Sequence, residues 1–219
     1  EIERKQPKTG GDYEISLNEP PNENGRGSLF VAAQSNVVKG QAGLKQKDRQ
    51  KAIAQFEEAL GRWRAGGEIL EQLHTLHELG SMHFNAGAFE LAKQKYQEEL
   101  ELSGKTGNRT MEALALNGLG LVYDKQIEKS QAEKAYKSAL EISQQIGDRD
   151  IEANVLNNFA SLHKSVGEYQ SALIYYLQAL PLWQALGDTA RETNAISNLG
   201  TLYRTLGDKQ KALFYQESA

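Results

Sequence analysis

The stretch GDRDIEANVLNNFASLHKSVGEYQSALIYYLQAL, residues 147–180, contains the features that decide the fold. It opens on a Gly-Asp pair, holds an Asn pair and carries one histidine, so it has the look of a functional motif. The same arrangement occurs elsewhere in the chain: Gly-Glu, Gly-Asn and Gly-Asp pairs begin at residues 67, 107 and 187, in steps of forty residues. A fixed period of this length indicates a repeat architecture rather than a single site.

Each repeat has the pattern of two helices. In the quoted stretch Leu156 and Phe159 recur at helical spacing, Gly167 interrupts the pattern, and a second apolar stripe follows it. Gly147 can take the left-handed conformation that closes the preceding helix, and Asp148 can cap the next one. Phosphate or metal binding at this pair is the competing interpretation. Phosphate loops are Gly-rich turns that follow a strand, and no such turn is present, so capping explains the pair better.

The repeats resemble the tetratricopeptide repeat (TPR). The family signature falls in the last repeat on Ile196, Leu199-Gly200, Tyr203, Gly207, Ala212 and Ala219, and three earlier copies are in register with it. Departures are few, because Ile127 replaces a helix-breaking Gly, Glu99 replaces an Ala and Gln216 replaces an aromatic residue. These departures raise questions of local packing only. The forty-residue period is similar to that of kinesin light chains and, most of all, of bacterial proteins whose repeats precede a caspase-like CHAT domain.

The resemblance implies an all-α fold, a superhelical solenoid of about five helix pairs. It covers roughly residues 28–219, with repeats at approximately 28–66, 67–106, 107–146, 147–186 and 187–219. One helix pair cannot bury its own apolar stripe, so a continuous core forms only when neighbouring repeats stack. We therefore expect the small residues at one repeated position to allow close approach of paired helices: Gly80, Gly120, Ala160 and Gly200.

Residues 1–27 differ in composition, since they hold three of the four prolines and four glycines. They are interpreted as a non-helical linker or as the end of an upstream β-domain, because DYEISL alternates like a short strand. The chain starts without a methionine and ends inside an unfinished apolar pattern, so we expect it to be a piece of a longer protein.

Composition narrows the function classes. The net charge of −4 and pI near 5.7 do not suggest nucleic acid or an anionic membrane as an obligatory partner. No run of eighteen apolar residues exists that could span a bilayer. The absence of cysteine excludes a disulfide, a thiolate metal site and a cysteine nucleophile within these residues. The compartment and the oligomeric state stay open.

No catalytic motif is present, and we expect no enzymatic activity and no cofactor. The esterase-type, Walker and His-Glu-x-x-His patterns are absent. His74, His77 and His83 could approach one another on a helix, but no acidic residue is obviously placed to complete a zinc site, so no metal is expected. His83 and His163 occupy the repeat's tyrosine position and are expected to be packed and hydrogen-bonded. Trp63 and Trp183 are likewise expected to be packing residues.

The resemblance further implies that the first helix of each pair lines a concave groove. Carried over position by position, the predicted peptide-binding residues are His77, Ser81, Asn117, Leu121, Asn154, Asn157, Ser161, Lys164, Asn194, Ser197, Thr201 and Arg204. Asn side chains both donate and accept, so a row of them can satisfy the backbone of an extended peptide. The alternative is that these residues are a solvated polar surface on a scaffold that binds elsewhere. The Lys and Arg pair of the chaperone-tail carboxylate clamp is missing.

Two functions fit these features. The first is a non-catalytic scaffold that binds a protein or peptide. An acidic ligand is favoured, because Lys125, Lys164 and Arg204 outnumber Asp124 in the C-terminal half of the groove. The acidic segment of residues 11–25 is itself a hypothetical ligand for the groove of a neighbouring molecule, with a linker packed on the first helix pair as the alternative. The second function is the regulatory part of a larger enzyme such as a CHAT protease.

Overall fold

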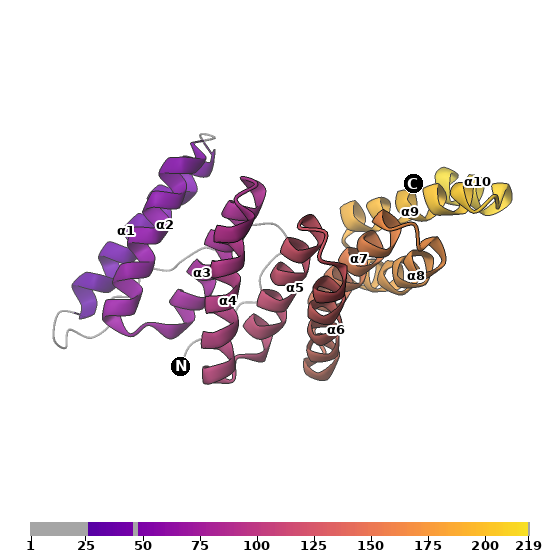
Figure 1. Ribbon diagram of the computed structural model, residues 1–219. Coiled ribbons are helices and arrows are strands. Elements are labelled where there is room, and N and C mark those ends of the chain that lie inside the picture. Colours follow the sequence, from indigo (N-terminus) through magenta and orange to yellow (C-terminus); the bar gives the residue numbers. More distant parts are fainter. Residues whose placement is uncertain (1–25, 46–47, 219) are drawn as a thin grey trace.

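The computed structural model describes residues 26–45 and 48–218, and this part of the chain consists of ten helices joined by short turns (Figure 1). The helices are α1 (Arg26–Lys45), α2 (Arg49–Gly66), α3 (Ile69–Asn85), α4 (Phe89–Thr106), α5 (Arg109–Lys125), α6 (Lys129–Ile146), α7 (Arg149–Ser165), α8 (Tyr169–Leu186), α9 (Thr189–Thr205) and α10 (Lys209–Glu217). The predicted all-α array of five helix pairs is confirmed. None of the described helices is both long and apolar enough to cross a membrane.

The helix boundaries follow the forty-residue period and the predicted caps. Gly147 ends α6 at φ 70°, and the side chain of Asp148 accepts a hydrogen bond from the backbone N–H of Ile151 at the start of α7. Left-handed glycines close α2, α4 and α8 in the same way, at Gly67, Gly107 and Gly187. At the N-terminus, α1 begins at Arg26, two residues before the boundary expected at residue 28. The strand or linker expected before it lies outside the described residues.

Aromatic rings fill the space that small residues leave between helices. A Cβ added at Gly80 would lie 2.6 Å from the Tyr96 ring, and one added at Gly118 of the following repeat would also lie 2.6 Å from it. Tyr96 therefore packs between α3 and α5 as well as within its own helix pair. Gly120 faces Tyr136 in the same manner. The buried Trp63 and Trp183, exposed by 3% and 2%, are packing residues as expected.

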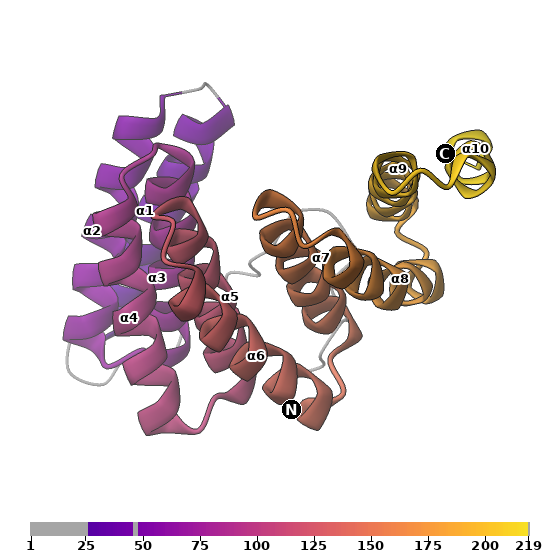
Figure 2. The same ribbon diagram turned by 45° about the vertical axis from the view of Figure 1, so that its right-hand side comes forward.

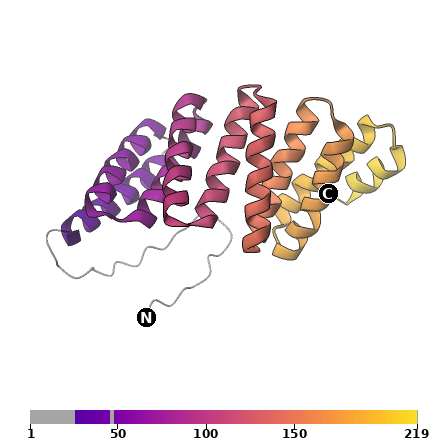
Figure 3. The ribbon, with the colours of Figure 1, turned by 60° about the horizontal axis from the view of Figure 1, so that its bottom comes forward.

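The first helices of the pairs form the inner side of the array. Within the described residues α3 contacts α5 and α5 contacts α7, whereas no two successive second helices are in contact to a comparable extent. The first helices of the pairs thus lie closer to one another than the second helices do. Such an array curves so that the first helices are on its inner side. Figure 3 shows the pairs following one another in a curved row, and in Figure 2 α9 is seen nearly end-on while α2 is seen from the side. The helix axes therefore turn along the array.

Candidate functional site

The twelve predicted groove residues lie on the first helices α3, α5, α7 and α9, on the inner side of the curve. None of them is buried, and Asn194, Ser197 and Arg204 are exposed. Their spacing along each helix follows the helical period, so the set of each helix lies on one face of that helix.

Two hydrogen bonds tie the groove face of one repeat to that of the next. The side-chain Nδ2 of Asn158 on α7 donates to Oδ1 of Asn117 on α5 over 3.0 Å. In the other direction, Nζ of Lys164 donates to Oδ1 of Asn198 on α9, also over 3.0 Å. Asn158 and Asn198 were absent from the predicted set. Each of them directly follows a predicted groove residue, at position 157 or 197, and this is the sequence feature that could have pointed to them. Their hydrogen-bond partners lie one repeat away and become neighbours only when the repeats stack.

Further groove side chains bond within their own helix pair. The hydroxyls of Ser161 and Tyr176 are 2.8 Å apart, and Nδ2 of Asn154 donates to the backbone oxygen of Asp150 over 2.9 Å. The hydroxyl of Thr201 donates to a backbone oxygen one turn earlier. These side chains are less available to a ligand than their polarity suggests.

Unused hydrogen-bonding capacity is concentrated at the C-terminal end of the groove. The side chains of Asn157, Asn194, Ser197 and Arg204 form no hydrogen bond or ion pair with any described residue. All four lie on α7 and α9, whereas the polar groove residues of α3 and α5 have internal partners. The structure thus separates groove residues that are hydrogen-bonded within the array from groove residues that have no such partner among the described residues.

His77, at the N-terminal end of the groove, pairs with a carboxylate that is fully buried. Its Nδ1 lies 3.1 and 3.2 Å from the two carboxylate oxygens of Glu99 on α4, a residue with 0% exposure. Burial raises the pKa of Glu99 although the hydrogen bond from His77 opposes it. Burial opposes the charged form of His77, but its bond to Glu99 and the charge of that residue prevail, so the pKa of His77 is raised. Glu99, which replaces the family's alanine, therefore has a partner.

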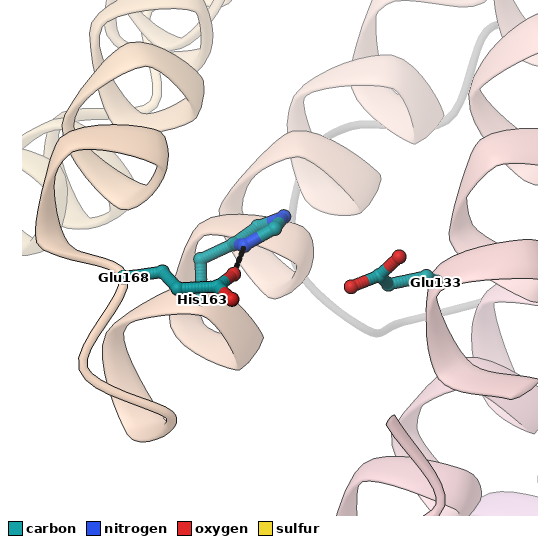
Figure 4. Close-up of side chains that lie close together, drawn as sticks. All are labelled: Glu133, His163 and Glu168. Carbon is teal, nitrogen blue, oxygen red and sulfur yellow. Dashed lines mark hydrogen bonds and ion pairs between the residues drawn. The ribbon is translucent and has the colours of Figure 1, made fainter. Parts of the chain in front are cut away.

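A second cluster joins α6, α7 and the turn before α8 (Figure 4). Nδ1 of His163 lies 2.6 Å from Oε2 of Glu168, and Glu133 brings a third donor atom to within 4.8 Å of the other two. The ammonium of Lys129 lies 2.5 Å from Glu168 and 3.5 Å from Glu133, so one cation already pairs with both carboxylates. The bonds from Lys129 and then His163 lower the pKa of Glu168. This cluster is an ion-pair network between two repeats.

His77 pairs with the single carboxylate of Glu99, but none of the three histidines considered for zinc joins a group of three potential ligands among the described residues. Among the described residues, the cluster of Glu133, His163 and Glu168 is the group close enough to share a metal ion, and it contains none of His74, His77 and His83. His163 is buried and hydrogen-bonded as expected. His83 is buried as well, and burial lowers its pKa, but its ring forms no hydrogen bond with a described residue.

Comparison with solved structures gives the same architecture in several proteins. BtubC (BKLC) from P. vanneervenii is 24% identical, with a TM-score of 0.75 over 87% of this chain and 79% of that one. A Rap protein complexed with competence and sporulation factor is 17% identical, with a TM-score of 0.76 over 90% and 54%. A Signal Transduction ATPase with Numerous Domains (STAND) from Pyrococcus horikoshii, with a tetratricopeptide repeat sensor, is 17% identical, with a TM-score of 0.75 over 91% and 30%. At these sequence identities, the structural similarity shows a shared fold and nothing further.

The chain thus spans about half the length of the Rap protein and less than a third of the ATPase. No curated protein matches the sequence significantly. Family profiles described as tetratricopeptide repeat match residues 71–145 and 151–219, and a second profile of the same description matches residues 33–62. Together the matches cover most of the described array, including the first helix pair, where the sequence signals are faint. The chain belongs to the tetratricopeptide repeat family.

Proposed function

We propose that this array binds an extended peptide segment non-covalently along its concave face, chiefly over α7 and α9. The observation that carries the proposal is the grouping of four groove side chains without internal partners on these two helices. Asn157 and Asn194 each offer a donor and an acceptor, which is what the backbone of an extended peptide requires. Ser197 and Arg204 add a hydroxyl and a cation. The array itself supplies a preformed surface, so little ordering of the protein opposes binding.

The similar fold of the Rap protein supports this function class. That protein was solved in complex with competence and sporulation factor, and 90% of the present chain superimposes on it. The braced groove residues are consistent with the same role. The bonds from Asn158 to Asn117 and from Lys164 to Asn198 hold three first helices in a fixed relation, which keeps a binding surface in shape.

The charge of the C-terminal half favours an acidic segment. Lys164 is half-buried and bonds to a neutral amide, and Arg204 is exposed without an acidic partner among the described residues. Asp124 is the opposing carboxyl, and burial raises its pKa although Lys125 lowers it. Exposed charge pairs are individually weak and screened by salt, so the charges select the ligand more than they tighten its binding. The acidic residues 11–25 carry such chemistry, but they lie outside the described residues.

The test begins with peptides selected on the chain from a random phage-displayed library. We expect the selected peptides to bind at least about tenfold more weakly to the double variant Asn157→Ala/Asn194→Ala, because two hydrogen bonds contribute about 1–3 kcal/mol. The matched control, Gln97→Ala/Gln178→Ala, removes two amides from the exposed faces of second helices. Equal affinities for the wild type and the Asn double variant, or equal losses in both variants, would place binding elsewhere.

A second candidate is the sensor region of a larger signalling protein. The observation in its favour is the fold shared with an ATPase that has a tetratricopeptide repeat sensor and of which this chain matches 30%. The expectation of a CHAT-type catalytic partner stays a prediction. The sequence of the gene on both sides of these residues decides it, because a catalytic domain with His and Cys in the same reading frame would favour the sensor role.

A further inference from the structure

Ile127, in the turn between α5 and α6, has a backbone conformation that does not suit its side chain. Its φ is +62°, in the left-handed region, where a β-branched residue is a genuine outlier. The equivalent turns of the flanking repeats contain Gly87, Gly167 and Gly207, which have positive φ without this cost. The family departure at this position therefore introduces backbone strain into an otherwise regular array.

The strain is not compensated by packing within the molecule. The Ile127 side chain is 89% exposed, so the array gains almost no burial from it. Val166, which follows α7 in the next turn, is also exposed, by 44%. Strained residues and exposed apolar side chains each tend to occur at functional surfaces. Here the two coincide on neighbouring turns along one edge of the array.

A hollow with a volume of about 350 Å³ lies between these turns. Its apolar lining comes from Ile127, Leu162 and Val166, and its polar lining includes Asp124, Lys125 and Lys129. Leu162 is buried at 1% exposure and gives the hollow an apolar floor. The hollow therefore has room for an aliphatic side chain together with a neighbouring group, and charged groups lie at its border.

The charges at the border favour an anionic group beside that side chain. The ammonium of Lys129 is held by Glu168 and Glu133. Lys125 is exposed and forms no ion pair with a described residue. Asp124 is half-buried next to it, and burial raises the pKa of its carboxyl although the charge of Lys125 lowers it. An incoming carboxylate would find Lys125 available.

We propose that this edge hollow binds a partner polypeptide through an aliphatic side chain adjacent to a carboxylate. The aliphatic group contacts Ile127, Val166 and Leu162, and the carboxylate pairs with Lys125. The hollow adjoins the groove through Asp124 and Lys125, but its lining contains none of the four unpartnered groove residues on α7 and α9, so binding in it can be tested by itself. It also explains why an exposed isoleucine stands where a glycine would be less strained.

The experiment uses the complete 219-residue chain, labelled with ¹⁵N, and the dipeptide N-acetyl-Glu-Leu-amide as the probe. In titrations to about 10 mM, we expect saturable chemical-shift changes at the amides of residues 124–129 and 162–166. Two further probes separate the contributions. N-acetyl-Lys-Leu-amide keeps the aliphatic group but reverses the charge, and N-acetyl-Glu-Ala-amide keeps the charge but shortens the aliphatic group. Both should bind several-fold more weakly.

Ile127→Gly is the decisive variant, because the proposal predicts opposite effects on stability and binding. Release of the left-handed strain should raise the Tm by about 2–4 °C, while the affinity for N-acetyl-Glu-Leu-amide falls several-fold. Lys125→Gln should weaken the same probe without the gain in stability. The control Ile174→Ala removes an exposed aliphatic side chain from the outer face of α8 and should change neither shift pattern nor affinity.

Three outcomes would overturn the proposal. The first is no saturable shift at the highest probe concentration. The second is an affinity for N-acetyl-Glu-Leu-amide that Ile127→Gly leaves unchanged, since the isoleucine would then be a tolerated substitution only. The third is a shift pattern centred on Asn157, Asn194, Ser197 and Arg204, which would assign the probe to the groove over α7 and α9. The groove proposal is tested with other variants, so either one can fail alone.

Discussion

His77 and Glu99 form a pair in which a fully buried carboxylate is neutralised from the groove side. Nδ1 of His77 lies 3.1 Å from Oε1 of Glu99, which is 0% exposed, whereas the imidazole keeps 29% exposure. The next repeat has Asn117 and Ala139 at the same two positions. The Glu99 carboxylate and the His77 imidazole therefore occur together in one repeat, and the next repeat has an uncharged residue in place of each.

Removal of the imidazole alone should be strongly destabilising. In His77→Asn the Glu99 carboxylate stays buried without a cation, which costs about 3–5 kcal/mol of unfolding free energy. The double variant His77→Asn/Glu99→Ala copies the next repeat, and we expect its stability to equal or exceed that of the wild type. Urea unfolding followed by circular dichroism measures both. A single variant as stable as the wild type would show that the pair contributes no net attraction.

The same pair should make stability depend on pH. Both pKa values are raised in the folded state, so the folded chain holds protons to higher pH than the unfolded chain does. The unfolding free energy then falls as the pH rises. The fall begins near pH 4.5, the ordinary pKa of the Glu99 carboxyl, and continues beyond pH 6.5, the ordinary pKa of the His77 imidazole. We expect the wild type to lose stability relative to His77→Asn/Glu99→Ala between about pH 5 and about pH 8. A constant difference, or one of opposite sign, would contradict this assignment.

Gly118 should resist even the smallest substitution. A Cβ there would meet the Tyr96 ring at 2.6 Å, and the same ring lies just as close to the Cβ position of Gly80, so it has little room to move away. We expect Gly118→Ala to cost about 1–3 kcal/mol. Gly61 on α2 is the matched control, because a Cβ there has nothing within 4 Å and Gly61→Ala should stabilise by about 0.5–1 kcal/mol. Thermal unfolding of both variants provides the comparison, and similar effects would show that backbone entropy dominates at both sites.

The fold could be predicted from the sequence because its signals are local and repeated. The capping by Asp148 and the left-handed Gly147 depend on neighbours within a few residues, and the forty-residue period presents them several times. Most of the small-residue contacts were also predictable from the register. Gly200 behaves differently, since its nearest neighbour is Gln216 at 3.4 Å rather than an aromatic ring. That difference follows from the Gln216 substitution.

The site was predictable only in part. The register placed the candidate groove residues on the first helices of the pairs, but it could not tell side chains with internal hydrogen bonds from side chains without them, because Asn158 reaches Asn117 across a repeat boundary. The cluster around His163 also escaped the sequence, since its members come from three elements and become neighbours only through stacking. The sequence shows that Ile127 replaces a glycine of the family pattern. Only the structure shows that its side chain is exposed and that its φ is positive.

The most direct measurement is a crystal structure of the chain with one of the phage-selected peptides. We expect an extended peptide on the concave side of α7 and α9, with its backbone hydrogen-bonded to the amides of Asn157 and Asn194. A carboxylate of the peptide should lie near Arg204. A peptide on the outer faces of the second helices, with Asn157 and Asn194 left free, would contradict the proposed function.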